Sequence, residues 1–211
     1  TLIAMLAFAG NSLLCRLALK GTEIDAASFT AIRMLSGAIV LWLIVRLRTP
    51  VRTGSGSWPS ACALFLYATT FSFAYISLPA GTGALLLFSA VQVTMIGHGL
   101  WRGERLQAPQ VAGFVVAIAG LVGLLLPGLT APPLSGSLLM LIAGVAWGAY
   151  SLRGKTSGDP TRATADNFLR TLPLVLILSL ASLPWASVDL AGVGYAVASG
   201  ALASGLGYAI W

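Results

Sequence analysis

Apolar residues fill the chain in long runs, separated by short polar segments rich in glycine and proline. A helix needs about 20 apolar residues to cross the hydrocarbon core of a bilayer, and the runs have this length. They are apolar on every side, which excludes amphipathic helices on a soluble core. Eight segments are predicted as transmembrane helices: 1–19, 27–47, 59–78, 81–101, 108–126, 135–154, 166–185 and 190–211.

The composition agrees with this prediction. Of the 211 residues, 57% are hydrophobic and only 9% are charged, whereas soluble domains carry about 25% charged residues. We therefore expect an all-α polytopic membrane protein. The net charge of +6 comes from basic residues in short loops. We expect a lipid bilayer as surroundings and no nucleic-acid partner, because such loop charges set orientation.

The basic residues fall unevenly on the two sides of the predicted helices. Cytoplasmic loops of membrane proteins are enriched in Lys and Arg. The pattern therefore predicts that the N-terminus and the loops after the second, fourth and sixth helices are cytoplasmic. One side of the predicted helices holds only Arg16 and Lys20, and the other holds Arg46, Arg48, Arg52, Arg102, Arg105, Arg153, Lys155 and Arg162.

An internal repeat is indicated at an offset of 137 residues. The matched pairs are Arg16 with Arg153, Gly21 with Gly158, Arg33 with Arg170, and Phe71 with Tyr208. Arginine is rare in this chain, so its two matches carry most weight. The offset covers five helices, an odd number, so the second copy is expected to be inverted. Inverted repeats are typical of transporters, whose substrate site lies at the repeat interface.

Small residues predict where helices approach closely. The connection at 78–83 is very short, so the third and fourth helices are expected to form a tight antiparallel hairpin. Glycines four apart, at Gly99/Gly103 and Gly144/Gly148, are expected to let neighbouring helices pack closely.

Three stretches of the sequence resemble the EamA-like branch of the drug/metabolite transporter superfamily. The first is Phe29-Thr30-Ala31-Ile32-Arg33. The second is Trp101-Arg102-Gly103-Glu104-Arg105-Leu106, followed by Gly113 and Gly120. The third is the segment 136–150, from Gly136 to Tyr150, which resembles the helix that opens a second repeat.

This resemblance implies ten transmembrane helices in two inverted five-helix repeats. Residues 1–127 are then the first repeat, and 135–211 are the second repeat, truncated after its third helix. The chain starts at Thr1 and ends in an apolar run, so a fragment of a longer protein is expected. The resemblance implies an integral protein of the bacterial inner membrane, and it leaves room for a homodimer.

Arg33 is a charge inside an apolar helix, which is costly unless the charge meets a cavity or a partner. One interpretation is that it binds an anionic group of a substrate, such as a carboxylate. The alternative is an anchor that snorkels to the interface or pairs with Glu23 or Asp25. Arg170 has Asp166 one turn earlier as an ion-pair partner. Because the two arginines correspond in the repeat, an architectural role for Arg33 is favoured.

The leading candidate for substrate contact is therefore Gln92, an amide in the middle of the fourth helix that needs a partner at membrane depth. Asn11 and Ser12 are the corresponding polar positions of the first helix. Trp147 and Tyr150, in the sixth helix, are expected to line the same cavity or to be packing residues.

The expected function is secondary transport, with export of amino acids or other small metabolites by alternating access. The substrate class is implied by the resemblance. A membrane enzyme is not expected, because the sequence has one histidine and no HExxH or DxxD pattern. No cofactor is expected either, since no phosphate-binding loop is present. The alternative is a structural or regulatory membrane protein that transports nothing.

Overall fold

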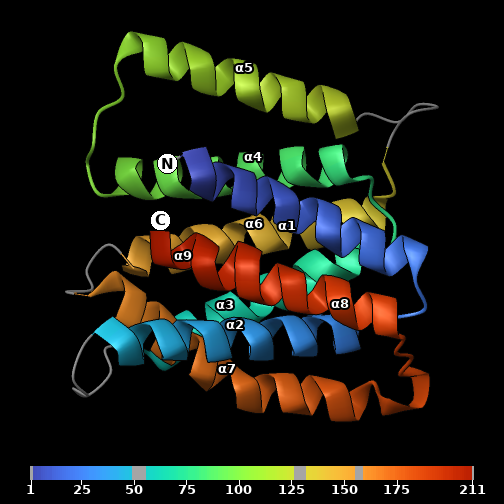
Figure 1. Cartoon of the computed structure of the whole chain (residues 1–211). Coiled ribbons are helices and arrows are strands. Elements are labelled where there is room, and N and C mark those ends of the chain that lie inside the picture. The colour runs from blue at the N-terminus through green and yellow to red at the C-terminus, as the bar shows by residue number, and fades with distance from the viewer. Residues whose placement is uncertain (1, 49–55, 126–131, 155–158, 211) are drawn as a thin grey trace.

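The computed structural model describes residues 2–48, 56–125, 132–154 and 159–210, and this part of the chain contains helices and no strand (Figure 1). The elements are α1 (Leu2–Gly21), α2 (Ala26–Arg48), α3 (Trp58–Tyr75), α4 (Ala80–Trp101), α5 (Ala108–Leu125), α6 (Leu134–Gly154), α7 (Pro160–Ala181), η1 (Leu183–Trp185), α8 (Leu190–Ala198), η2 (Ser199–Leu206) and α9 (Gly207–Ile210).

The expected all-α membrane architecture is confirmed. Among the described residues, the helices α2, α4, α6 and α7 are long and apolar enough to cross a membrane by length and composition. The other predicted segments are helical at their expected places. Large apolar side chains such as Leu47, Trp101 and Val116 are exposed on the outside. Such a surface is stable in lipid, because the hydrocarbon core of a bilayer contains no water that would disfavour exposed apolar side chains.

The predicted span 166–185 is wrong at both ends. The helix α7 begins at Pro160, where Asp159 accepts a hydrogen bond from the backbone of Arg162, and it ends at Ala181. An N-cap carboxylate followed by proline fixes a helix start more strongly than hydropathy does. The last predicted residues instead form the short 3₁₀ turn η1.

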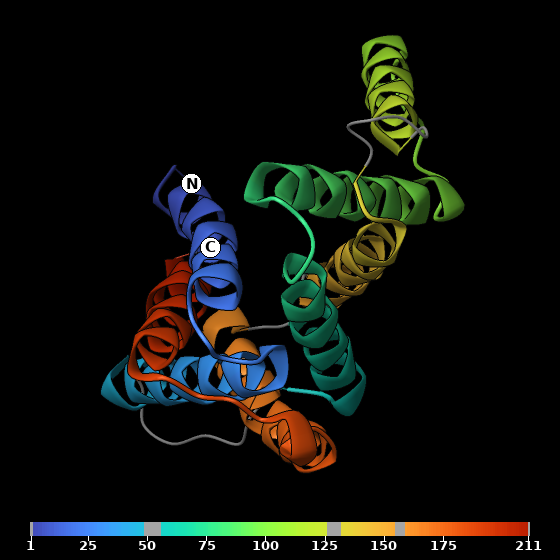
Figure 2. The same cartoon turned by 90° about the vertical axis from the view of Figure 1, so that its right-hand side faces the viewer.

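The helices fall into two groups (Figure 2). In one group, α6 packs against both α3 and α4. In the other, α2 packs against α7 and η2, and α1 packs against α8 and η2. Contacts of α3 with α7 and α2 join the two groups. Helix α5 lies outside both and contacts α4.

The expected hairpin of α3 and α4 is wrong. Direct contacts between these two helices are few, and each packs mainly on α6. A short connection keeps the adjoining ends of two helices close, but it does not force the helices to pack along their length. A Cβ on Gly144 would lie 2.5 Å from the Cβ of Ala90, and one on Gly148 would lie 2.8 Å from that of Thr94. This glycine pair therefore brings α6 against α4, as predicted.

The other glycine pair serves a different purpose. A Cβ on Gly99 would meet the side chain of Glu104 rather than another helix, and one on Gly103 would meet nothing. Gly103 has a φ of +88°, a conformation that glycine adopts without strain. It therefore ends the chain reversal after α4, and the prediction of close helix packing here is wrong.

The segment η2 is a π-helical stretch in an otherwise continuous helix from Leu190 to Ile210. It packs on α2 with very little space between the backbones. A Cβ on Gly200 would overlap the backbone carbonyl of Arg33 and the hydroxyl of Ser36, and one on Gly37 would lie 3.1 Å from the Gly200 oxygen. π-Helical turns are rare and occur frequently at functional sites.

Candidate functional site

Arg33 is buried in the centre of the bundle, with 1% of its surface exposed. It lies about 10 Å along α2 from the first residue of that helix. Its Nη2 donates a hydrogen bond to the backbone oxygen of Ala68 in α3, at 2.8 Å. Its Nε and Nη1 have no hydrogen-bond partner among the described residues. The anchor at the interface that the sequence favoured is therefore not the observed arrangement.

Aromatic rings surround the Arg33 guanidinium. Its Cζ lies 5.1 Å from the ring centroid of Phe71 and 5.9 Å from those of Phe29 and Tyr67. The faces of such rings carry partial negative charge, which attracts a cation. Phe29 is one turn before Arg33 on α2, and the other two rings project from α3. We call Arg33 and these three rings the arginine cluster.

The contacts in the arginine cluster offset part of the cost of burying the charge. An arginine at the centre of a membrane helix costs about 2.5–3.5 kcal/mol on insertion scales. A hydrogen bond from a charged group contributes about 1.5–3 kcal/mol, and each cation–π contact about 0.5–2 kcal/mol. These gains are of the same size as the insertion cost, and the two N–H groups without an acceptor add about 1–3 kcal/mol each to that cost. Within the described part of the chain Arg33 has no carboxylate partner, and its Nε and Nη1 are left without an acceptor.

Asn11 and Ser12 reach the same region from α1, and both are buried. The Nδ2 of Asn11 donates to the Tyr67 hydroxyl at 3.4 Å, and its Oδ1 accepts a hydrogen bond from the Ser199 hydroxyl at 2.5 Å. Ser12 interacts with the hydroxyl of Tyr75. Asn11 therefore links α1 to the arginine cluster and to η2.

Trp147 and Tyr150 form a second side of the site, on α6. The Trp147 ring stacks on Tyr67 with 5.5 Å between centroids, and Phe8 meets it edge-on at 5.2 Å. Tyr150 donates a hydrogen bond to the Thr164 hydroxyl at 3.2 Å. Its ring centroid lies 6.2 Å from that of Tyr208. The structure thus brings five of the six predicted site residues into one connected set.

Gln92 is the predicted residue that lies elsewhere. It is exposed and lines a groove of about 180 Å³ between α4 and α5. The groove is otherwise mostly apolar, with Leu85, Phe88 and Phe114 in its walls. The sequence could not indicate this position, because a helix that is apolar on all sides does not reveal which side faces the bundle.

Several residues of the site were not selected from the sequence as site residues, among them Tyr67, Tyr208 and Ser199. The hydroxyl of Tyr208 is buried beside the site. Its ring contacts Phe8 at 5.8 Å and Phe168 at 5.9 Å. The predicted repeat held a signal, since it pairs Tyr208 with Phe71 of the arginine cluster.

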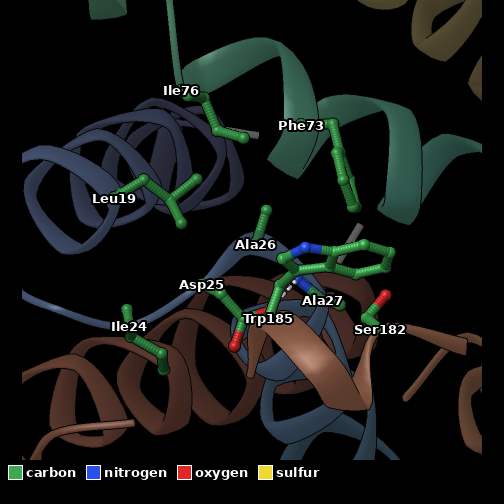
Figure 3. A pocket seen from close by; sticks show the side chains of 9 residues that line it. All are labelled: Leu19, Ile24, Asp25, Ala26, Ala27, Phe73, Ile76, Ser182 and Trp185. Atoms are coloured by element: carbon green, nitrogen blue, oxygen red, sulfur yellow. Dashed lines mark hydrogen bonds between the residues drawn. The ribbon is translucent and has the colours of Figure 1, made fainter. Parts of the chain in front are cut away.

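A separate cavity of about 380 Å³ opens at the end of the bundle where α2 begins (Figure 3). Asp25 and Trp185 are among its lining residues. Asp25 accepts hydrogen bonds from the backbone nitrogens of Ala27 and Ser28 through Oδ1, and from that of Ser187 through Oδ2. Burial raises the pKa of this carboxyl, but the hydrogen bonds outweigh it and hold the pKa below its ordinary value.

Comparison with known proteins identifies the family. The model of the EamA-like transporter family matches residues 1–126. The "Uncharacterized protein PA1977" of Pseudomonas aeruginosa is 58% identical over 212 residues, which span all of this chain and 74% of that protein. A protein of known crystal structure shares the fold with a TM-score of 0.69 and 20% identity, over 99% of this chain and 76% of that one. The chain therefore belongs to the EamA-like transporter family, a part of the drug/metabolite transporter superfamily.

Proposed function

We propose that this protein is a secondary transporter that exports amino acids or other small metabolites by alternating access. Membership of a transporter family supports membrane transport in general. The further parts of the proposal are the outward direction, the substrate class and the site at Arg33. The bacterial inner membrane and a cytoplasmic N-terminus belong to it as well. These parts rest on the family resemblance, the loop charges and the geometry of the arginine cluster.

The observation that carries the proposal is the pair of unpartnered nitrogens on Arg33. They are buried, so no bulk water satisfies them. An anion such as a carboxylate accepts charge-assisted hydrogen bonds from a guanidinium and would supply an acceptor that Arg33 lacks. In this proposal the substrate carboxylate binds Arg33. Asn11 and Ser12 contact its polar part, and the rings of Trp147 and Tyr150 contact its apolar part.

Gln92 stands apart in this proposal. Its groove between α4 and α5 offers an amide and Ser89 as polar groups amid apolar walls. A contact of Gln92 with substrate therefore needs a second location, on the flank of the bundle. Substitution by Leu is expected to reduce transport if this contact exists, and unchanged kinetics would remove Gln92 from the site. The homodimer expected from the sequence also stays a prediction.

The inverted repeat gains support from how the helices pack. An inverted repeat pairs α1 with α6, α2 with α7, and α3 with α8 and η2. Contacts of α3 with α6 then correspond to contacts of α8 and η2 with α1, and both occur. Likewise α3 contacts α7, and η2 contacts α2. We propose that the group of α3, α4 and α6 and the group of α1, α2, α7, α8 and η2 rock about the arginine cluster, as in other inverted-repeat transporters.

The test is transport by the full-length protein in proteoliposomes loaded with a panel of amino acids and other small carboxylates. Arg33→Lys keeps the charge and removes the two-pronged geometry. We expect it to lower kcat/KM by about tenfold or more, the value of one charge-assisted hydrogen bond. Arg170→Lys is the matched control, and it should transport like the unchanged protein.

Two results would count against the proposal. If the full-length protein transports none of the compounds, the alternative of a non-transporting structural or regulatory protein is favoured. If Arg33→Lys and Arg170→Lys transport equally well, substrate does not bind Arg33. Thermal unfolding of both variants in detergent separates a loss of transport from a loss of folding.

A further inference from the structure

Two polar contacts tie the two halves of the chain together at opposite ends of the bundle. The first, which we call the Asp25 contact, joins the start of α2 to the segment before α8. The Asp25 backbone nitrogen donates to the Ser187 oxygen at 2.9 Å, and the Ser187 nitrogen donates to Asp25 Oδ2 at 3.0 Å. These paired bonds hold residues that are far apart in sequence.

The second, the Asp166 contact, joins α7 to the segment before α3. The Gly56 nitrogen donates to Asp166 Oδ2 at 3.2 Å, and the Ser57 nitrogen donates to Asn167 Oδ1 at 2.9 Å. The approach is close, because a Cβ on Gly56 would lie 2.6 Å from the Cβ of Asp166. Figure 1 shows that α2 and α7 begin at opposite ends of the molecule. The two contacts therefore also lie at opposite ends.

The two contacts have the same logic. In each, side-chain oxygens near the start of the second helix of one half of the chain accept hydrogen bonds from backbone N–H groups. These N–H groups lie just before the third helix of the other half. The helix α2 of the first half holds the segment before α8, and α7 of the second half holds the segment before α3. Asp189 differs, because it accepts a hydrogen bond from Gly192 of its own helix.

We infer that the Asp25 contact and the Asp166 contact are the two gates of the alternating-access cycle, which open in turn. This inference rests on the proposed function. Both contacts are formed in the structure, and Arg33, which lies between them, is 1% exposed. Asp25 also forms part of the wall of the 380 Å³ cavity, so the Asp25 contact lies beside an opening at this end of the bundle.

A native thiol can report which gate is open. Cys15 is fully buried and interacts electrostatically with Arg33, whereas Cys62 is exposed. In a Cys62→Ser background of the full-length protein, Cys15 is the reporter. A membrane-impermeant maleimide is applied to either face of oriented vesicles. Cys15 alkylation is then measured without any need to know the substrate.

Asp25→Ala is expected to raise alkylation of Cys15 from the face that carries the α1–α2 connection. The double variant Asp166→Ala/Asn167→Ala is expected to raise it from the other face. Each increase should be about tenfold, since the loss of one or two hydrogen bonds shifts a two-state equilibrium by this factor. Asp189→Ala is the control, because Asp189 accepts a hydrogen bond only within its own helix, and it should change neither rate.

Equal increases from both faces would show general loosening and overturn the inference, as would unchanged labelling in both gate variants. A disulfide between Asp25→Cys and Ser187→Cys gives a second measurement in a background that lacks the native thiols. It should block substrate transport until it is reduced, and unimpaired transport with the bond closed would also overturn the inference. Failure of the proposed function is distinguishable, because then the protein with intact contacts transports nothing.

Discussion

Arg33 and Arg170 occupy corresponding positions in the proposed repeat, yet their surroundings are opposite. Arg33 is 1% exposed and touches three rings and one backbone oxygen. Arg170 has 35% of its side chain exposed, and its Nη2 lies 3.7 Å from the Asp166 carboxylate. Its guanidinium also lies 5.9 Å from the ring of Trp58. If the proposed repeat holds, it keeps a charge at the same place in both copies while giving it a different environment.

The residue one turn earlier accounts for much of this difference. Arg170 follows Asp166, and Arg33 follows Phe29 at the matching position of the repeat. A carboxylate at this spacing pairs with the arginine and satisfies it. A phenyl ring attracts the cation but accepts no conventional hydrogen bond, so nitrogens of Arg33 remain available. The comparison suggests that one arginine contributes to the helix end and the other to the site.

The strongest test of the comparison removes each charge in turn. Arg33→Gln is expected to lower kcat/KM for transport about a hundredfold, because a charged hydrogen-bonding group contributes about 1.5–3 kcal/mol to binding. Arg170→Gln should stay within about threefold of the unchanged protein, because surface ion pairs contribute little. Transport of labelled substrate into proteoliposomes measures both. Equal losses would show that the two arginines have the same role.

Giving Arg33 the partner that Arg170 has is the next test. Phe29→Asp places a carboxylate one turn before Arg33, which should occupy the free nitrogens. Transport should then fall about tenfold, since a competing internal anion replaces the substrate. Phe29→Leu keeps an apolar residue without the carboxylate and should keep most activity. If Phe29→Asp transports normally, the free nitrogens of Arg33 have no role in binding.

The close backbone approach at Arg33 offers a test of stability. A methyl group on Gly200 would overlap the Arg33 carbonyl, so Gly200→Ala must push η2 away from α2. Overpacking of this kind costs about 1–3 kcal/mol in the free energy of unfolding. Gly97→Ala, where a Cβ would meet nothing, is the control. Denaturant unfolding in detergent compares the two, and equal midpoints would contradict the tight contact.

The smallest effect is expected at the Arg170 ion pair. Asp166 and Arg170 are both partly exposed, with 27% and 35% of their side chains accessible. A double-mutant cycle of Asp166→Asn and Arg170→Gln should give a coupling energy below about 1 kcal/mol. A coupling of several kcal/mol would mean that Arg170 is held as firmly as Arg33, and it would erase the contrast.

The sequence predicted the helices well, because long apolar runs leave the backbone no other way to satisfy its polar groups in lipid. It predicted the start of α7 poorly, because hydropathy does not register the cap formed by Asp159. It also selected Arg33, Asn11 and Trp147, which lie in one connected set, but it misjudged how Arg33 is held. The ring partners Tyr67 and Phe71 come from α3, and no spacing within α2 indicates them.

The orientation of Gln92 could not be predicted from the sequence. This residue was selected for its depth in the fourth helix, and depth says nothing about direction around the helix axis. In a soluble helix the apolar stripe gives this direction. In α4 every side is apolar, so packing of α6 through Gly144 and Gly148 decides which side is inward.

The π-helical segment from Ser199 to Leu206 determines where the Tyr208 ring points. Successive residues of an α-helix are turned by about 100° around its axis. A wider turn ahead of Tyr208 changes the angle at which this ring leaves the helix, independently of the side chains that follow. Its position beside Phe8 and Phe168 is therefore a property of helix winding as well as of residue identity. Deleting one residue between Ser199 and Tyr208 would rotate the Tyr208 ring away from the site, although the sequence would still contain every amino acid of the site.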